Sequence, residues 1–316
     1  MNIIVFGGSG FLGSHVADVL TSRGHKVIIF DKIPSPYLLK DQEMIVGDVL
    51  DEKAVRQAVH GADIIYNFIA LADIDEAYLR PVETTKVNVL GNVNILEAAK
   101  EEKVKRFVFS SSVYVYSDAG SFYRSSKQAC ELFIESYQKV YGLDFTILRY
   151  GSLYGLRSDE RNWMYRILKQ AIEEKKITRE GDGEEIREYI HVQDAARLSV
   201  DILTEHYKNR RVIISGNERM KVKDLLVMIK EMLKNDIEIE YLPIKRGEHY
   251  EITPYVFNPQ MATKIQSNEY LDMGQGILHI LGHLYDQHRN SKEVSQSRLD
   301  KTNLANRYIK KEKVNI

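Results

Sequence analysis

The chain has 316 residues, of which 44% are hydrophobic, and a formal net charge of -1 at pH 7. This length suits one large domain or a core domain with a smaller lobe. The near-neutral charge argues against a nucleic-acid partner or an anionic membrane surface. The single cysteine, Cys130, excludes an intramolecular disulfide and a cysteine-rich zinc site, and we expect no metal centre. No basic leader precedes the first apolar run, and no stretch approaches the ~20 apolar residues that span a bilayer. We therefore expect a soluble, cytoplasmic protein.

Short apolar runs alternate with helical patterns in the first half of the chain. The runs are rich in Val, Ile and Phe with little polar alternation, which is typical of a parallel sheet covered on both faces. They predict strands at Asn2–Phe6, Lys26–Phe30, Ile64–Phe68, Arg106–Phe109 and Phe145–Arg149. Helices are expected between them at Gly13–Arg23, Asp51–His60, Thr84–Glu102 and Ser125–Tyr141. This succession predicts an α/β fold with a doubly wound parallel sheet, and Arg211–Ser215 is a candidate further strand.

The second half is less regular. It predicts helices at Asn162–Lys175 and Val222–Leu233 and a strand at Arg187–Val192. We expect residues 1–150 and about 188–216 to form the sheet domain, and residues 151–187 and 217–286 to form a smaller, discontinuous C-terminal substrate lobe. Residues 287–316 are polar, which predicts a mobile tail or an added helix.

A glycine-rich turn follows the first expected strand and opens the first helix. Gly7, Gly10 and Gly13 form the pattern G-x-x-G-x-x-G, which lets the backbone approach a pyrophosphate at a helix N-terminus. Asp31 ends the next strand, where its carboxylate accepts hydrogen bonds from ribose hydroxyls and repels a 2′-phosphate. The pattern therefore predicts a dinucleotide site that prefers NAD over NADP. A tight structural turn with a surface aspartate is the alternative.

Further cofactor contacts are predicted around that turn. Phe11 and Leu12 lie within the turn itself, and Leu71 follows the expected strand Ile64–Phe68. Asp48 and Val49 follow a short strand-like segment, where they either close over an adenine or form a solvated helix cap.

A strand that ends in serines precedes a tyrosine and a lysine at helical spacing. Ser112 ends the strand, and Tyr123 and Lys127 stand four residues apart, on one face of the expected helix. A neighbouring ammonium and a cationic nicotinamide both favour the phenolate, so Tyr123 is a candidate base for a sugar hydroxyl, and Ser112 a candidate to hold the same oxygen. The alternatives are a partly buried helix tyrosine and a strand-terminal serine.

The tyrosine–lysine spacing is not unique in this chain. Tyr165 and Lys169 share it in the expected second lobe, and Tyr241 and Lys245 share it around a proline. Because strand C-termini face the ligand crevice in a parallel sheet, we assign the chemistry to Tyr123, which follows the serine-ended strand.

Taken together, these motifs resemble the extended short-chain dehydrogenase/reductase family, with its Rossmann fold. The resemblance is to its NAD-dependent nucleotide-sugar epimerases and dehydratases, of the UDP-glucose 4-epimerase type. It runs from residue 1 to about residue 285. The matching text is G-G-S-G-F-L-G at Gly7–Gly13, G-D-V at Gly47–Val49, N-V-L-G at Asn88–Gly91, F-S-S-S at Phe109–Ser112, Tyr123 with Lys127, L-R-Y at Leu148–Tyr150, Y-G at Tyr154–Gly155, and G-D-G-E-E-I-R-E-Y-I-H-V-Q-D at Gly181–Asp194.

The resemblance implies roles for particular residues. It implies that Ser112, Tyr123 and Lys127 form the catalytic trio and that Arg187 and Arg246 hold the substrate diphosphate, for which a guanidinium is well suited. Ser152 stands where the family often has a substrate-contacting asparagine.

Departures from the family pattern narrow the expected reaction. Sugar dehydratases of the family carry an Asp-Glu pair after the catalytic Ser or Thr, and decarboxylases keep the glutamate. Here Val113 and Tyr114 occupy these positions and supply no carboxylate. We therefore expect NAD-dependent epimerisation of a nucleotide sugar, at C4 through a 4-keto intermediate. The alternatives are a nucleotide-sugar reductase or dehydrogenase with net redox, and a non-catalytic NAD-binding protein.

Two expected helices, Thr84–Glu102 and Ser125–Tyr141, are apolar on more than one face. The residues concerned are Val87, Val89, Ile95, Leu132, Phe133 and Tyr137. They predict a homodimer that pairs through an intermolecular four-helix bundle, which the resemblance also implies.

Overall fold

The computed structural model describes residues 1–243, 251, 263–265, 269–290 and 292. Its main element is a parallel sheet with the strand order β13-β10-β6-β5-β4-β1-β2-β3. The strands are β1 (Asn2–Phe6), β2 (Lys26–Asp31), β3 (Gln42–Val46), β4 (Ile64–Asn67), β5 (Arg106–Ser112), β6 (Phe145–Tyr150), β10 (Arg210–Ile214) and β13 (Thr263–Lys264). The chain runs outward from β1 in one direction and outward from β4 in the other. The ends of β1 and β4 therefore form the switch point at which parallel sheets bind ligands.

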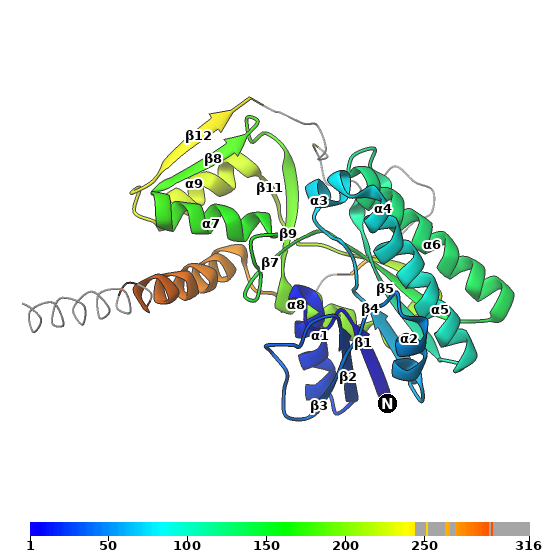
Figure 1. The fold of residues 1–316 in the computed structure, drawn as a ribbon. Coiled ribbons are helices and arrows are strands. Elements are labelled where there is room, and N and C mark those ends of the chain that lie inside the picture. The colour runs from blue at the N-terminus through cyan, green and yellow to red at the C-terminus, as the bar shows by residue number, and fades with distance from the viewer. Residues whose placement is uncertain (244–250, 252–262, 266–268, 291, 293–316) are drawn as a thin grey trace, which may run out of the picture.

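Helices cover both faces of this sheet (Figure 1). Helices α1 (Phe11–Ser22) and α8 (Val192–Asp201) pack on one face. Helices α2 (Glu52–Val59), α5 (Gly91–Glu101) and α6 (Ser121–Tyr141) pack on the other. Successive strand residues point to opposite faces, so each strand contributes to both apolar cores. This arrangement confirms the predicted α/β fold with a doubly wound sheet.

One predicted helix differs from the structure. The segment Thr84–Glu102 was expected as a single helix, but it consists of α4 (Pro81–Thr84), a π-helical turn (Thr85–Leu90) and α5. The wider turn carries Asn88, whose side chain is buried and bonded to neighbouring elements. Wide turns of this kind often occur at functional sites, and the apolar pattern that predicted the helix does not distinguish them.

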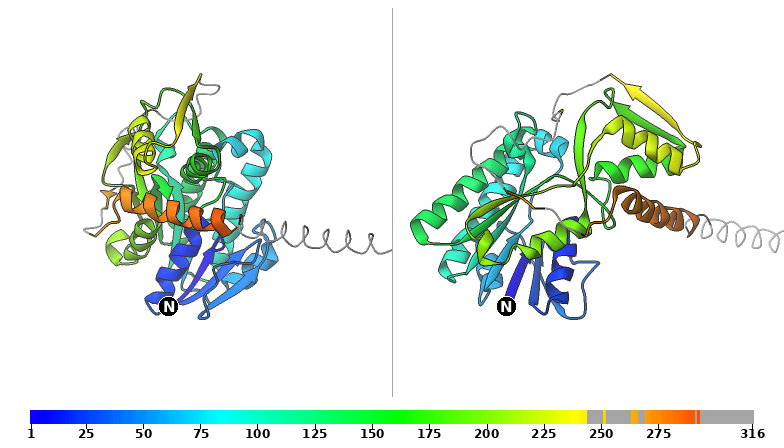
Figure 2. Two further views of the ribbon diagram at one scale, coloured as in Figure 1. Left: turned by 90° about the vertical axis from the view of Figure 1, so that its left-hand side faces the viewer. Right: turned by 180° about the vertical axis from the view of Figure 1, so that it is seen from behind.

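A smaller lobe has an apolar cluster of its own. It contains a three-stranded sheet of β7 (Ser152–Tyr154), β9 (Ile186–His191) and β11 (Arg219–Lys221), and a pair formed by β8 (Lys176–Glu180) and β12 (Glu238–Leu242). Helices α7 (Trp163–Glu174) and α9 (Val222–Met232) pack with them, together with a helix over residues 273–290. Figure 2 shows this last helix from two further sides. This helix runs past residue 286, where the substrate lobe was expected to end and a polar tail to begin. Residues 293–316 lie outside the described part.

Within the described part of the chain, no helix is long and apolar enough to cross a membrane.

Candidate active site

The turn between β1 and α1 has room only for glycine at two positions. Gly7 has a φ of +79°, and a Cβ there would lie 2.9 Å from Ile69 N. A Cβ on Gly13 would lie 2.2 Å from the carbonyl oxygen of Gly7. Gly10 is the N-cap of α1, and no side chain caps that helix. The first N–H groups of α1 are therefore left to a ligand, and phosphate oxygens suit them.

Asp31 lies beside this turn at the end of β2. Its Oδ2 accepts a hydrogen bond from Ser9 N at 3.0 Å, and its Oδ1 accepts one from Ile33 N at 3.4 Å. A carboxylate has about four acceptor positions, so capacity remains for ribose hydroxyls. The structure thus brings the predicted ribose-binding carboxylate next to the predicted pyrophosphate turn.

Asp48 and Val49 make local contacts. Asp48 accepts a hydrogen bond from Leu50 N at 2.9 Å and pairs with Lys32 at 3.2 Å, and these contacts lower the pKa of its carboxyl. The Val49 side chain is buried against Gly91. Neither residue lines the crevice described next, and their contacts match a capped turn before α2.

A crevice of about 340 Å³ opens at the carboxyl ends of β1, β4 and β5. It joins the glycine turn to the predicted catalytic residues and to a segment of the smaller lobe. Its lining includes Gly7, Gly10, Phe11, Leu12, Gly13, Leu71, Ser112 and Tyr123, together with Asp73, Glu76, Asp159, Arg161 and Asn162. Most of the predicted cofactor residues and two of the predicted trio therefore share one cavity.

The trio combines a strand end with the first turns of α6. Ser112 ends β5, is buried, and accepts a hydrogen bond from Tyr114 N at 3.3 Å. Tyr123 lies in the first turn of α6, and the Nζ of Lys127 lies 5.7 Å from the centre of its ring. Lys127 Nζ donates to Ser110 O at 2.7 Å. Burial lowers the pKa of Lys127 to about 8, because the interior disfavours the ammonium.

A buried ionic network behind the trio was not predicted from the sequence. Glu131 lies one turn after Lys127 on α6 and accepts Ser111 Oγ at 2.5 Å and Arg149 Nε at 3.0 Å. Arg149 also donates to the Tyr116 hydroxyl and stacks on its ring at 4.5 Å. The network joins β5, β6 and α6 and so fixes the helix that carries Tyr123 and Lys127. In the sequence Glu131 has the pattern of a solvated helix residue, so no local signal identified this network.

Asn88 joins the opposite side of the crevice to α6. Its Oδ1 accepts Leu71 N at 2.7 Å, and its Nδ2 donates to Leu71 O at 3.2 Å and to Ser126 Oγ at 2.9 Å. The loop that carries Leu71 is therefore held against α6, the helix that carries Tyr123 and Lys127.

The crevice continues into a second hollow of about 230 Å³ in the smaller lobe. Ser152, Arg187 and Tyr114 line it, together with Trp163 and three arginines that the sequence reading did not select, namely Arg161, Arg166 and Arg179. Arg187 is buried and donates to Glu251 O at 3.3 Å. The remaining predicted phosphate ligand, Arg246, lies outside the described residues.

The two other tyrosine–lysine pairs lie elsewhere. Tyr165 and Lys169 belong to α7, outside the crevice, and Lys169 pairs with Glu160. Tyr241 lies in β12, and Lys245 falls outside the described part of the chain.

Comparisons with known proteins identify the family of the chain. Residues 3–215 match the NAD dependent epimerase/dehydratase family. A UDP-glucose 4-epimerase of Halalkalibacterium halodurans is 25% identical over 284 residues, covering 78% of this chain and 85% of that protein. A UDP-N-acetyl-alpha-D-glucosaminuronate decarboxylase of Bacillus cytotoxicus is 26% identical over 269 residues, covering 77% and 84%. The crystal structure of UDP-glucose 4-epimerase from Thermotoga maritima has a TM-score of 0.79 at 24% identity, over 91% of this chain and 99% of that one, which shows a common fold.

Proposed function

Since the chain belongs to the NAD dependent epimerase/dehydratase family, a family of enzymes that use NAD, we propose that it epimerises a nucleotide-activated sugar at C4 through a 4-keto intermediate. The observation that carries the proposal is the shared crevice. Ser112 and Tyr123 line the same cavity as the glycine turn, and Lys127 lies directly behind Tyr123.

The residues of the crevice fit NAD. The glycine turn offers a surface that a Cβ at Gly7 or Gly13 would obstruct, and α1 presents N–H groups that no side chain caps. Asp31 lies within hydrogen-bonding reach of the same turn through Ser9 N. These features suit a pyrophosphate and an unphosphorylated ribose. When bound, NAD supplies the acceptor and later the donor of the sugar's hydride.

Each member of the trio has a distinct role in this proposal. Tyr123 removes the proton of the C4 hydroxyl, and the Lys127 ammonium favours the phenolate that this requires. Ser112 holds the oxygen of the same carbon. For epimerisation the keto sugar must turn over before Tyr123 returns the proton, so the pocket has to hold the nucleotide more firmly than the sugar ring.

The carboxylates around the crevice argue against dehydration and decarboxylation. Val113 and Tyr114 follow Ser112, and three carboxylates line the described cavity elsewhere. Asp73 caps helix α3 (Ile74–Leu79), while Glu76 pairs with Arg80 and Asp159 with Arg161. None of the three adjoins Ser112 in the sequence, and the two positions after Ser112 carry no carboxylate.

The arginines of the lobe suit the substrate diphosphate. We propose that Arg187 binds it together with Arg246, and that Arg161 and Arg166 contribute from the crevice side. Ser152 lines the same hollow as Arg161, Arg166 and Arg187 and is proposed to contact the substrate. Guanidinium groups bind phosphate oxygens in pairs, which gives both affinity and orientation.

Incubation with a panel of nucleotide sugars in D₂O tests the proposal. UDP-glucose, UDP-N-acetylglucosamine, UDP-glucuronate and dTDP-glucose are followed by proton nuclear magnetic resonance and by the reduced-nicotinamide absorbance. A C4 epimer without deuterium at C4 is expected, because the returning hydride does not come from solvent. A steady net change in absorbance identifies a reductase or dehydrogenase instead. An absence of turnover with every sugar contradicts the proposal.

We also propose that the chain forms a homodimer through α5 and α6. Leu132 is 60% exposed, and Phe133 is likewise exposed beside it on α6. Ile95 and Tyr137, which were expected on this face, are instead buried within the chain. Two copies of the exposed face would cover one another as a four-helix bundle. Light scattering should give a dimer, and Leu132→Asp should give a monomer, while Val227→Asp, at an exposed position of α9, should not.

A further inference from the structure

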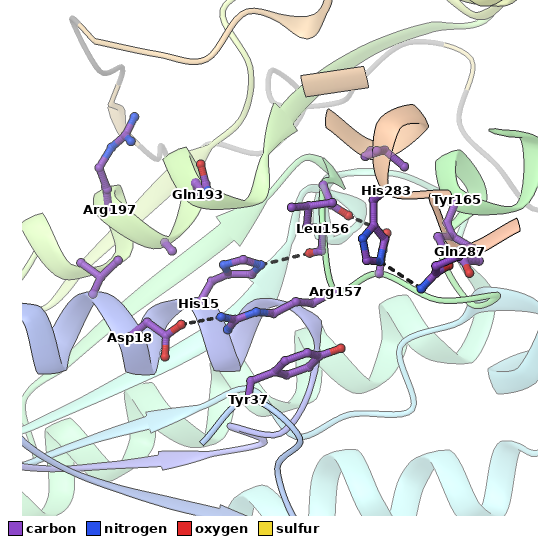
Figure 3. A pocket seen from close by; sticks show the side chains of 15 residues that line it. His15, Asp18, Tyr37, Leu156, Arg157, Tyr165, Gln193, Arg197, His283 and Gln287 are labelled. Atoms are coloured by element: carbon purple, nitrogen blue, oxygen red, sulfur yellow. Dashed lines mark hydrogen bonds and ion pairs between the residues drawn. The ribbon is translucent and has the colours of Figure 1, made fainter. Parts of the chain in front are cut away.

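A second large cavity lies outside the crevice, between α1, α8 and the helix over residues 273–290 (Figure 3). Its volume is about 590 Å³, within the range of roughly 300 to 1,000 Å³ that is typical of small-molecule sites. We call it the interlobe cavity. Its lining comes from both the sheet domain and the smaller lobe, and of the crevice residues only Ser158 also lines it. The proposed catalytic chemistry therefore leaves this cavity unused.

A planar platform forms one wall of the interlobe cavity. The guanidinium carbon of Arg157 lies 4.5 Å from the centre of the Tyr37 ring. Figure 3 shows these two side chains on one side of the cavity, with Tyr165 and His283 on the other. Stacked guanidinium and phenol groups favour contact with another flat ring. The shape and chemistry of this wall therefore suit an aromatic ligand.

The polar groups of the cavity favour an acceptor-bearing ligand. Asp18 is the single carboxylate among the described residues that line it. Both of its oxygens are engaged, one by Arg157 at 2.7 Å and the other by Gln42 at 3.2 Å. The remaining polar lining comes from Arg157 and Arg197, from the rings of His15 and His283, and from uncharged hydroxyl and amide groups of Tyr37, Ser158, Tyr165, Gln193 and Gln287. A carboxylate, sulfonate or phosphate on the ligand therefore meets guanidinium groups here and no carboxylate with a free oxygen.

Arg157 is held in its position at an energetic cost. Its backbone has a φ of +68°, a conformation that L residues other than glycine rarely adopt. Its Nη1 is buried and has no hydrogen-bond partner among the described residues. Strained residues and unsatisfied donors cluster at ligand-binding positions, because the surrounding structure holds them ready for a partner. The adjacent carbonyl of Leu156 is fixed by His15 Nε2 at 3.0 Å.

From these four observations together we propose that the interlobe cavity binds a small aromatic anion, stacked on the Tyr37–Arg157 platform with its acidic group toward the guanidinium. The site is separate from the NAD crevice and does not depend on the proposed epimerase reaction.

Anilinonaphthalene sulfonate is a suitable probe, because it is an aromatic anion that fluoresces in apolar sites. The full-length protein is first saturated with NAD and UDP to occupy the crevice. The probe should then bind at one saturable site per chain. N-phenylnaphthylamine has the same rings without the sulfonate, and we expect it to bind at least about tenfold more weakly.

Two variants test the location of this binding. Tyr37→Ala removes the platform, and Gln193→Trp fills the cavity from an exposed position on α8, where a larger side chain does not threaten the fold. Both variants should bind the probe at least about tenfold more weakly than the parent protein does. Tyr285→Ala is the matched control, since Tyr285 is an exposed aromatic on the same helix as His283 and does not line the cavity. The proposal is overturned if the saturated protein shows no single-site binding, if both variants bind like the control, or if the neutral dye binds as tightly.

Discussion

The two walls of the crevice are held by ion pairs of opposite character. On the wall formed by strand ends and α6, Arg149 and Glu131 pair with side chains only 3% and 6% exposed. On the wall formed by the smaller lobe, the Arg161–Asp159 pair is 71% and 53% exposed. A buried pair cannot lose a partner without leaving a charge unpaired, whereas exposed pairs exchange easily with solvent or ligand. The first wall therefore fixes the reacting groups, and the second can adapt to a charged substrate.

Tyr123→Phe tests the fixed wall with the largest expected effect. The change removes one hydroxyl, so it should lower turnover by roughly 10² to 10⁴ while NAD binding stays nearly intact. Lys127→Met should lower turnover and also weaken NAD binding, because its ammonium lies close behind the tyrosine ring. Turnover assays and NAD titration measure the two effects.

Tyr165→Phe is the control for that experiment. It has the same spacing to a lysine but lies on α7 outside the crevice, so we expect unchanged turnover. If Tyr123→Phe kept more than about a tenth of the activity, or if Tyr165→Phe were the inactive variant, the assigned catalytic centre would be wrong.

Glu131→Gln tests the buried network itself. It leaves Arg149 buried without its carboxylate partner, which should lower the free energy of unfolding by about 3 to 5 kcal/mol. Glu160→Gln breaks the exposed pair with Lys169 and should leave the urea midpoint almost unchanged. Equal midpoints for the two variants would contradict the contrast between the walls.

His191 adds a pH dependence to the base of the smaller lobe. Burial lowers its pKa to about 4, and its Nε2 has no partner among the described residues. The unfolded chain binds a proton below pH ~6.5 but the folded chain does not until about pH 4. Stability is therefore lost as the pH falls through this window, by about 2 kcal/mol between pH 7 and pH 5.

Urea unfolding of the protein and of His191→Asn at these two pH values measures that contribution. In the parent protein His191 Nδ1 accepts a hydrogen bond from Gln193 N at 3.4 Å. The side-chain oxygen of asparagine can accept the same bond, but asparagine does not titrate. The variant should lose less stability than the parent, and identical losses would show that another group is responsible.

Asp31 carries the smallest expected effect. Its carboxylate should favour NAD over NADP by at least about tenfold, or ~1.4 kcal/mol. Asp31→Ala should bring the two affinities together, while Asp48→Ala should leave their ratio unchanged, because Asp48 contacts its own turn and Lys32. If the parent protein bound NAD and NADP with comparable affinity, the assignment of Asp31 to the ribose hydroxyls would be wrong.

Much of the fold was predictable because its signals are local. The strands of the parallel sheet are short runs of Val, Ile and Phe, and each expected strand is present within two or three residues of its predicted bounds. The glycine spacing of the turn after β1 occurs in few kinds of structure. The family match confirms the resemblance that this spacing helped to suggest. Its two tight positions, Gly7 and Gly13, show why the spacing is informative.

The parts that were missed depend on pairing between distant elements. Glu131 is indistinguishable in sequence from a solvated helix residue, and its partner Arg149 comes from a strand 18 residues away. The arginine contacts across the crevice, such as Arg166 with Asp73 at 3.6 Å, require the lobe to be placed against the sheet. No local pattern carries that information, because it follows from the order of strands in the finished sheet.

Strand β13 limits how the smaller lobe can move. After leaving the sheet at β6 and returning at β10, the chain passes through the lobe again and comes back to pair with β10 through β13. The helix over residues 273–290 then follows β13 and packs in the lobe, so the lobe is joined to the sheet at β6, β10 and β13 and is not an arm attached at one point. Opening of the crevice should then be a small rocking motion about the exits of these strands, the kind of hinge that closes on a ligand while keeping both walls in register.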